Sequence, residues 1–177
     1  FGGAALQAAA TEEGVVISGL PATAPNALAT VLELTYEGAL DVSKQLPGPD
    51  SKGVIELSAM QADIHNHLGG EAKLENDHIG YWTSEKVTVS WTFRTAQAGN
   101  YTVKAGLSCT KASEVTVSSG SAKLAATVAS TTDYNKYKDV TLGTIALAAG
   151  EQSIKLSPVA GKWSPLNLRT LTLTPAP

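Results

Sequence analysis

The sequence predicts an all-β chain, an antiparallel β-sandwich of the jelly-roll type, preceded by two N-terminal strands. Three observations carry this prediction. Segments of alternating apolar and polar residues recur along the chain, and turns containing Gly, Pro or Asn separate them. Alternation places successive side chains on opposite faces of a sheet, as a half-buried strand requires. No segment has the apolar period of a helix, and short strands between turns are typical of sandwiches and barrels.

The N-terminal region, residues 1–45, is predicted to hold two strands. Gly14–Leu20 is apolar and ends before Pro21, which fixes φ and lacks a backbone donor. Ala29–Tyr36 follows, and its larger apolar side chains share one face: Leu32, Leu34 and Tyr36. Two strands alone are only marginally stable in water, so we expect this region to be the remnant of a preceding β domain. The turn-rich residues 46–53 are predicted to be a linker, and residues 54–177 to form the sandwich.

The central strand of the sandwich is predicted at Val87–Phe93, where large apolar residues alternate with hydroxyl residues. Before it, His78–Trp82 is predicted to be a loop that carries an imidazole and two adjacent large aromatics. After it, the turn Ala98–Asn100 leads into a second alternating segment, Tyr101–Leu107, and the two segments predict a hairpin. One segment therefore offers a core strand and, beside it, a candidate binding loop.

Further strands show the same alternation of apolar and polar residues. Around Gly143 the apolar residues change from even to odd positions, and a glycine at such a change predicts a β-bulge. The parity also slips between Leu168 and Leu171, which leaves the register of the last strand open. The remaining predicted strands are short and separated by turns: Val54–Leu57, Glu71–Leu74, Val115–Val117, Ala122–Val128, Val140–Leu147, Ile154–Leu156 and Asn167–Leu173.

Composition excludes several classes of function. Charged residues make up 16% of the 177, the net charge is -3, and no Lys/Arg cluster occurs, so a nucleic-acid or anionic-membrane partner is not expected. Cys109 is the only cysteine, which excludes an intrachain disulfide and a cysteine-rich zinc site, and we expect it to be buried. No apolar run has the length of a membrane span. The abundance of small hydroxyl and apolar residues is common in secreted all-β modules.

Aromatic residues in predicted loops are the candidate ligand contacts. Sugar rings have an apolar C–H face, so glycan-binding modules use aromatic planes for stacking and a few polar groups for the hydroxyls. Trp91 and Phe93 are expected in the core. The loop aromatics are Tyr81, Trp82, Tyr134, Tyr137 and Trp163. The tryptophans have an alternative role, which is to cap the end of the sandwich, and the last two tyrosines could lie in a solvated loop.

Several short motifs occur in a characteristic order: Ile79-Gly80-Tyr81-Trp82, Val89-Ser90-Trp91, Ala98–Val103, Leu142–Gly150 and Leu166-Asn167-Leu168. In this order they resemble family 6 and family 35 carbohydrate-binding modules, which are appended to secreted bacterial glycoside hydrolases. The resemblance covers Val54–Pro177. It implies a jelly roll with a loop-end site in which Asn167 bonds sugar hydroxyls, whereas the residue alone could equally cap a turn.

The resemblance also bears on metal binding and on the parent protein. Modules of this type often hold a structural calcium between carboxylates of the first and last strands. Glu56 could serve on the first strand, but Arg169 stands where the last strand often has an aspartate. Separately, Gly14–Gly38 is similar to the closing strands of the small β domain of retaining α-L-fucosidases, which implies a fucosidase-like parent. Apart from such a calcium, no cofactor is expected.

The histidines support a rival hypothesis. His65 and His67 would share one side of an extended segment, and Asp63, Glu71 or His78 could complete a three-ligand metal site. Such a site would suit a metal-dependent jelly-roll enzyme. A single His-x-His pair is a weak signal, and the sequence has no Gly-x-Ser-x-Gly or phosphate-binding motif.

These observations predict a noncatalytic glycan-binding module of a secreted glycoside hydrolase, located outside the cell or in the periplasm. We expect it to be a monomer with two partners, a glycan and a covalently linked catalytic domain. Trp82 and Trp163 are expected to stack on sugar rings, with edges and hydrogen bonds from Tyr81, His78, Asn167 and Tyr134. The alternatives are a structural spacer that packs on a catalytic domain and the metal-dependent enzyme.

Overall fold

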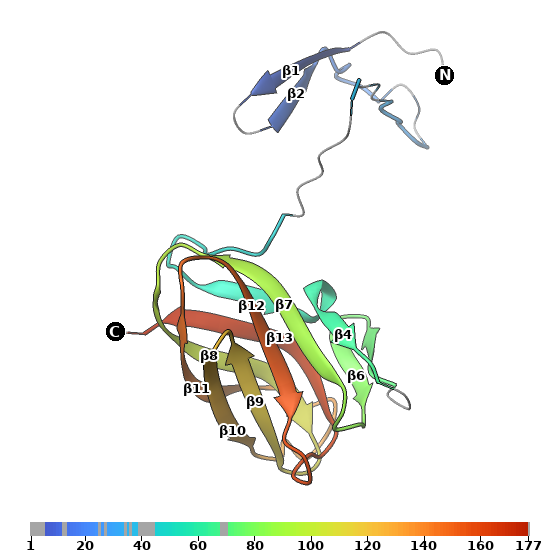
Figure 1. Cartoon of the computed structure of the whole chain (residues 1–177). Coiled ribbons are helices and arrows are strands. Elements are labelled where there is room, and N and C mark those ends of the chain that lie inside the picture. Colours follow the sequence, from blue (N-terminus) through green and yellow to red (C-terminus); the bar gives the residue numbers. More distant parts are fainter. Residues whose placement is uncertain are drawn as a thin grey trace. The chain divides into compact units, whose positions relative to one another are not determined.

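The computed structural model describes residues 6–11, 14–24, 26, 28–33, 35, 37–38, 45–67 and 71–176. The chain divides into two compact units, Phe1–Ser43 and Lys44–Pro177. Apart from one 3-10 turn, η1 (Ala59–Gln61), the regular elements of the described residues are strands, and all their pairings are antiparallel (Figure 1). The predicted all-β fold is thus confirmed.

The N-terminal unit contains one hairpin of β1 (Gln7–Thr11) and β2 (Gly14–Ser18). β2 confirms the predicted strand in that region. Its partner is the alanine-rich segment before it, where alanine's low strand propensity gave no signal. The second predicted strand, Ala29–Tyr36, is wrong for the part that the structure describes, because residues 29–33 and 35 form no strand. Leu34 and Tyr36 lie outside the described residues.

The second unit is a sandwich of two sheets (Figure 1). The five-stranded sheet has the order β10-β9-β12-β7-β4, with β4 (Asp63–His65), β7 (Thr88–Thr95), β9 (Ser113–Ser119), β10 (Ala122–Val128) and β12 (Gly150–Pro158). The six-stranded sheet has the order β11-β8-β13-β6-β5, and β3 also pairs with β13. Its strands are β3 (Ile55–Ser58), β5 (Lys73–Glu75), β6 (His78–Trp82), β8 (Gly99–Cys109), β11 (Lys138–Leu147) and β13 (Leu166–Pro175).

The core lies between the two sheets, and Val87–Phe93 contributes to it as expected. The predicted hairpin of this strand with Tyr101–Leu107 is wrong, because β7 and β8 belong to different sheets. Val87, Val89, Trp91 and Phe93 are all at most 1% exposed. Trp91 also donates its indole N–H to the carbonyl of Ser58 at 2.8 Å, so its one polar group is satisfied inside the core. Each large side chain buried in this way contributes about 1.5–3 kcal/mol, and this burial holds the two sheets together.

Two irregularities predicted from parity are β-bulges. In β11 the register against β8 shifts between Thr141 and Gly143, and Gly143 has φ +137°. In β13 the register against β8 shifts between Leu168 and Thr170, so Arg169 is the extra residue. Both bulges keep the apolar residues before and after them on the inner face, which is why the parity of the sequence slips there.

Among the described residues, no helix is long and apolar enough to cross a membrane.

Replacing Gly143 with alanine should destabilise the sandwich by about 1–3 kcal/mol, because the φ of +137° strains any residue with a Cβ. The added Cβ would also lie 2.6 Å from Cδ1 of Leu124, which would have to move. Urea unfolding of Gly143→Ala measures the loss. Gly99→Ala is the control, since a Cβ there meets nothing within 4 Å. Equal stability of Gly143→Ala and wild type would contradict the prediction.

Candidate functional site

A third bulge organises the candidate site, and it lies in the motif that carries the histidine and two aromatics. The structure makes His78–Trp82 a strand, β6, rather than the predicted loop. Against β13, Leu166 pairs with Trp82 and Leu168 pairs with Ile79. Two residues of β6, Gly80 and Tyr81, therefore stand opposite the single residue Asn167. Such bulges re-aim side chains and are common beside functional sites.

The bulge separates the two adjacent aromatics. Ile79 and Trp82 are three positions apart, yet both are buried in the core. Tyr81 instead takes the left-handed φ of +53° and is 56% exposed. The N–H of Thr83 donates to the carbonyl of Tyr81 at 2.9 Å, which closes a tight turn around Trp82. A tyrosine in this backbone region is strained, and such strain is concentrated at functional sites.

Trp82 is not available for stacking on a sugar, and that prediction needs correction. Its side chain is 1% exposed, and its indole N–H donates to the carbonyl of Val87 at 3.2 Å. The half-buried Trp163 packs on it, with ring centroids 5.0 Å apart and planes 46° apart. The bulge turns Trp82 inward, so it closes this part of the core. This is the capping role that the sequence left open for both tryptophans.

The other predicted residues meet at a groove of about 450 Å³ on the outer face of the six-stranded sheet. Asn167 lies between the buried Leu166 and Leu168, so alternation points its side chain outward. The groove is lined by Glu75, His78, Gly80, Tyr81, Trp82, Thr83, Tyr134, Pro165, Leu166 and Asn167. Five of the six predicted ligand-binding residues are in this set, and Trp163 is the one outside it.

Gly80 and Asn167 mark the floor of the groove. A Cβ at Gly80 would lie 3.3 Å from Nε2 of His78 and 3.6 Å from Oδ1 of Asn167. Two polar atoms from different strands therefore flank the same small residue. A larger residue at position 80 would fill the space beside both atoms.

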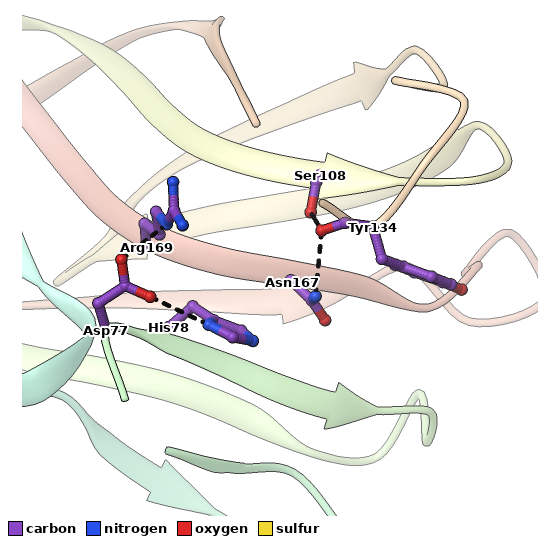
Figure 2. A network of polar contacts seen from close by, with 6 residues as sticks. All are labelled: Asp77, His78, Ser108, Tyr134, Asn167 and Arg169. Carbon is purple, nitrogen blue, oxygen red and sulfur yellow. Dashed lines mark hydrogen bonds and ion pairs between the residues drawn. The ribbon is translucent and has the colours of Figure 1, made fainter. Parts of the chain in front are cut away.

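Tyr134 comes from the loop between β10 and β11, and its backbone is tied to the sheet. Its carbonyl accepts a hydrogen bond from Oγ of Ser108 at 2.5 Å and a longer one from Nδ2 of Asn167 at 3.4 Å (Figure 2). Because the amide nitrogen of Asn167 is directed to this carbonyl, its Oδ1 is left toward Gly80. The ring of Tyr134 is 36% exposed beside the groove.

Three side chains, Asp77, Arg169 and Tyr137, form a closed ring of contacts with His78. Asp77 contacts Nδ1 of His78 at 3.2 Å and Nε of Arg169 at 3.0 Å (Figure 2). The guanidinium of Arg169 lies 3.6 Å above the ring of Tyr137, which in turn meets His78 edge-on. The hydrogen bond with His78 is the main cause that lowers the pKa of Asp77; desolvation opposes it, and the charge of Arg169 adds to the lowering. The imidazole is thus oriented with Nε2 toward the groove.

A second pair of charges borders Tyr81. Nζ of Lys73 bonds the carboxylate of Glu75 at 2.9 Å and lies 4.5 Å from the centre of the Tyr81 ring. The hydrogen bond and the charge of Glu75 raise the pKa of Lys73. One face of the tyrosine ring is therefore occupied by a cation, and the other remains for a ligand.

The metal site proposed from the histidines does not assemble among the described residues, where no three His, Cys, Asp or Glu side chains gather. His65 lies on β4 of the five-stranded sheet and bonds Ser90, whereas His78 lies on the other sheet. Glu56, the predicted calcium ligand, is exposed on β3 opposite Thr172 of β13. Arg169 is engaged by Asp77. Calcium binding by Glu56 stays a prediction.

Sequence reasoning missed the charged residues around the groove. Asp77, Arg169 and Glu75 drew no attention as partners because their pairing depends on strand register, which is not visible locally. Gly80 was noticed only as part of a motif. The available signal was the Ile79-x-x-Trp82 spacing, in which two large core residues three apart in an otherwise alternating segment indicate a bulge.

The fold of the second unit is similar to that of known β-sandwich modules. A family 35 carbohydrate-binding module from Clostridium thermocellum superimposes with a TM-score of 0.58 at 15% identity, covering 70% of this chain and 98% of that one. A carbohydrate-binding module of Cellvibrio mixtus lichenase 5A, solved with cellotriose, superimposes with a TM-score of 0.54 at 12% identity. The match covers 69% of this chain and 97% of that module. The Podospora anserina β-(1,4)-mannanase with a family 35 module gives 0.56 at 15% identity over 71% of this chain. The match spans about 28% of that mannanase.

In sequence, residues 61–165 match the family described as "Domain of unknown function (DUF5077)". The matched segment is more than half of the chain, so the chain belongs to this family. No functionally curated protein matches the sequence. The similarity to solved carbohydrate-binding modules therefore establishes the fold, and the function has to be argued from the groove.

Truncation of Trp82 should affect stability rather than recognition. Trp82→Ala removes a fully buried ring and should lower the free energy of unfolding by about 3–5 kcal/mol in urea denaturation. Tyr81→Ala, one residue away but exposed, should change it by less than about 0.5 kcal/mol. Similar losses for the two variants would show that the bulge does not separate the aromatics as described.

Acid should weaken the hydrogen bond between Asp77 and His78. The pKa of Asp77 is lowered from its ordinary 3.8 in the folded state, so its contribution to stability is complete above that value. The contribution is lost as the pH falls through the lower folded-state pKa. Asp77→Asn should therefore reduce the pH dependence of the melting temperature below about pH 4, relative to wild type. An unchanged acid profile would contradict this role for Asp77.

Proposed function

We propose that the sandwich is a noncatalytic glycan-binding module that holds a sugar in the groove between Tyr81 and Tyr134. The single observation that carries the proposal is Tyr81, a tyrosine that is 56% exposed and held at φ +53° at the edge of the groove. Exposed aromatic faces suit the apolar face of a sugar ring. A fold that bends its backbone to keep such a ring outside the core supports a binding role for it.

Polar atoms at the floor complete the recognition. Nε2 of His78 and Oδ1 of Asn167 flank Gly80 and can accept hydrogen bonds from sugar hydroxyls. Asp77 keeps Nδ1 of His78 engaged, which leaves Nε2 as the ring atom for the ligand. The proposal keeps four predicted ligand residues, Tyr81, Tyr134, His78 and Asn167, but gives Trp82 and Trp163 a structural role.

Similar structures support this proposal. One belongs to a β-(1,4)-mannanase, and another is a carbohydrate-binding module solved with cellotriose. We therefore propose that this module is attached to a secreted glycoside hydrolase, and that its partner domain carries the catalysis. The resemblance of Gly14–Gly38 to fucosidase strands is the basis for proposing an α-L-fucosidase as the parent, although the structure confirms only the first of these strands, β2. No observation favours a catalytic role for the groove.

Binding can be tested directly on the full chain with a glycan array, followed by titration calorimetry on any hit. Tyr81→Ala should weaken binding about tenfold or more, and Tyr134→Ala should weaken it less, since its ring is more covered. Met60→Ala is the matched control, because Met60 is a large apolar residue that is 68% exposed and lies outside the groove lining. Wild-type protein that binds no glycan, or Tyr81→Ala that binds like wild type, would refute the proposal.

A further inference from the structure

The charges around the groove specify what kind of sugar it takes. We infer that the groove selects uncharged glycans and discriminates against acidic ones such as uronates, an inference that rests on the proposed function. Among the residues that line the groove, Glu75 is the one carboxylate, and no lysine or arginine belongs to the lining. An acidic sugar entering the groove would meet this carboxylate and no free cation.

Two cations that contact the residues around the groove already have partners. Lys73 bonds Glu75 at 2.9 Å and lies against the ring of Tyr81 at 4.5 Å. Arg169 bonds Asp77 at 3.0 Å and lies over Tyr137 at 3.6 Å. The charge of each cation is already offset by the carboxylate of its ion pair. A sugar carboxylate would therefore gain little net attraction from Lys73 or Arg169.

The position of Glu75 places its carboxylate next to any ligand in the groove. It pairs with His78 across the β5–β6 ladder, and Lys73 pairs with Gly80, so both side chains of the ion pair border the groove floor. Lys73 lies over Tyr81, whereas Glu75 is the member of the pair that lines the groove. Asp77 adds a second carboxylate on the other side of the imidazole. Hydroxyl groups can donate to these acceptors, and a carboxylate cannot.

The test compares pairs of ligands that differ in one group. Each neutral oligosaccharide found to bind wild type is paired with its counterpart in which one C6 hydroxymethyl group is oxidised to a carboxylate. Affinities are measured at low ionic strength and one fixed pH, because salt screens exposed charges. Wild type should prefer the neutral member by about fivefold or more.

Variants of charged residues then test whether Glu75 causes the preference for neutral sugars. Glu75→Gln removes the lining carboxylate and releases Lys73, so the preference should fall to about twofold or less. Lys73→Gln leaves Glu75 uncompensated and should widen the preference. The matched control is Glu114→Gln, since Glu114 bonds Lys162 at 3.1 Å with the same 35% side-chain exposure as Glu75, but lies outside the groove lining. It should leave the preference unchanged.

The outcomes separate this inference from the proposed function. If neither member of any pair binds, the proposed function is wrong and the inference fails with it. If wild type binds both members equally, or prefers the acidic one, the module binds glycans but does not select uncharged ones. Equal effects of Glu75→Gln and Glu114→Gln would also overturn the inference, because they would reflect net charge rather than the groove.

Discussion

One extra residue in β6 is the constraint on which the candidate site depends. Gly80 and Tyr81 together face Asn167, so Ile79 and Trp82 both reach the core although they are three positions apart. A regular strand would place Trp82 on the outer face with His78, or would bury Tyr81 in its place. The bulge satisfies the core with the larger aromatic and leaves the smaller one exposed. Core packing and the proposed ligand contact thus fall to adjacent residues with opposite orientations.

The groove is pre-formed because its parts are anchored to rigid strands. Tyr134 belongs to a loop, but Ser108 and Asn167 bond its carbonyl. His78 is oriented by Asp77, which is itself held by Arg169 on the bulge of β13. Side chains fixed in this way lose little conformational freedom when a ligand binds, so more of the contact energy contributes to affinity.

The sequence predicted the sandwich well and the site only in part. Strands such as Val87–Phe93 alternate strictly between apolar and polar residues. Burial of the apolar face leaves a single register, so the alternation alone was sufficient to predict these strands. The sequence misassigns Trp82 because a large aromatic residue in a Gly-Tyr-Trp run has the same local pattern whether it packs in a core or lines a loop. Its orientation depends on a register shift against β13, a strand more than eighty residues away. The Asp77–Arg169 pair was invisible for the same reason.

The size and chemistry of the groove indicate how such a module would act. Two tyrosine faces, one of them partly covered by Lys73, and two polar atoms at the floor can engage one or two sugar rings. Contacts of this extent must first offset the lost translational freedom of the ligand, so each binding event is expected to be weak. Weak binding is sufficient for a module joined to a catalytic domain, because a tether gives the partner a millimolar effective concentration at the polysaccharide surface. If the proposed parent enzyme exists, rapid release would let it move along its substrate, which a tight site would prevent.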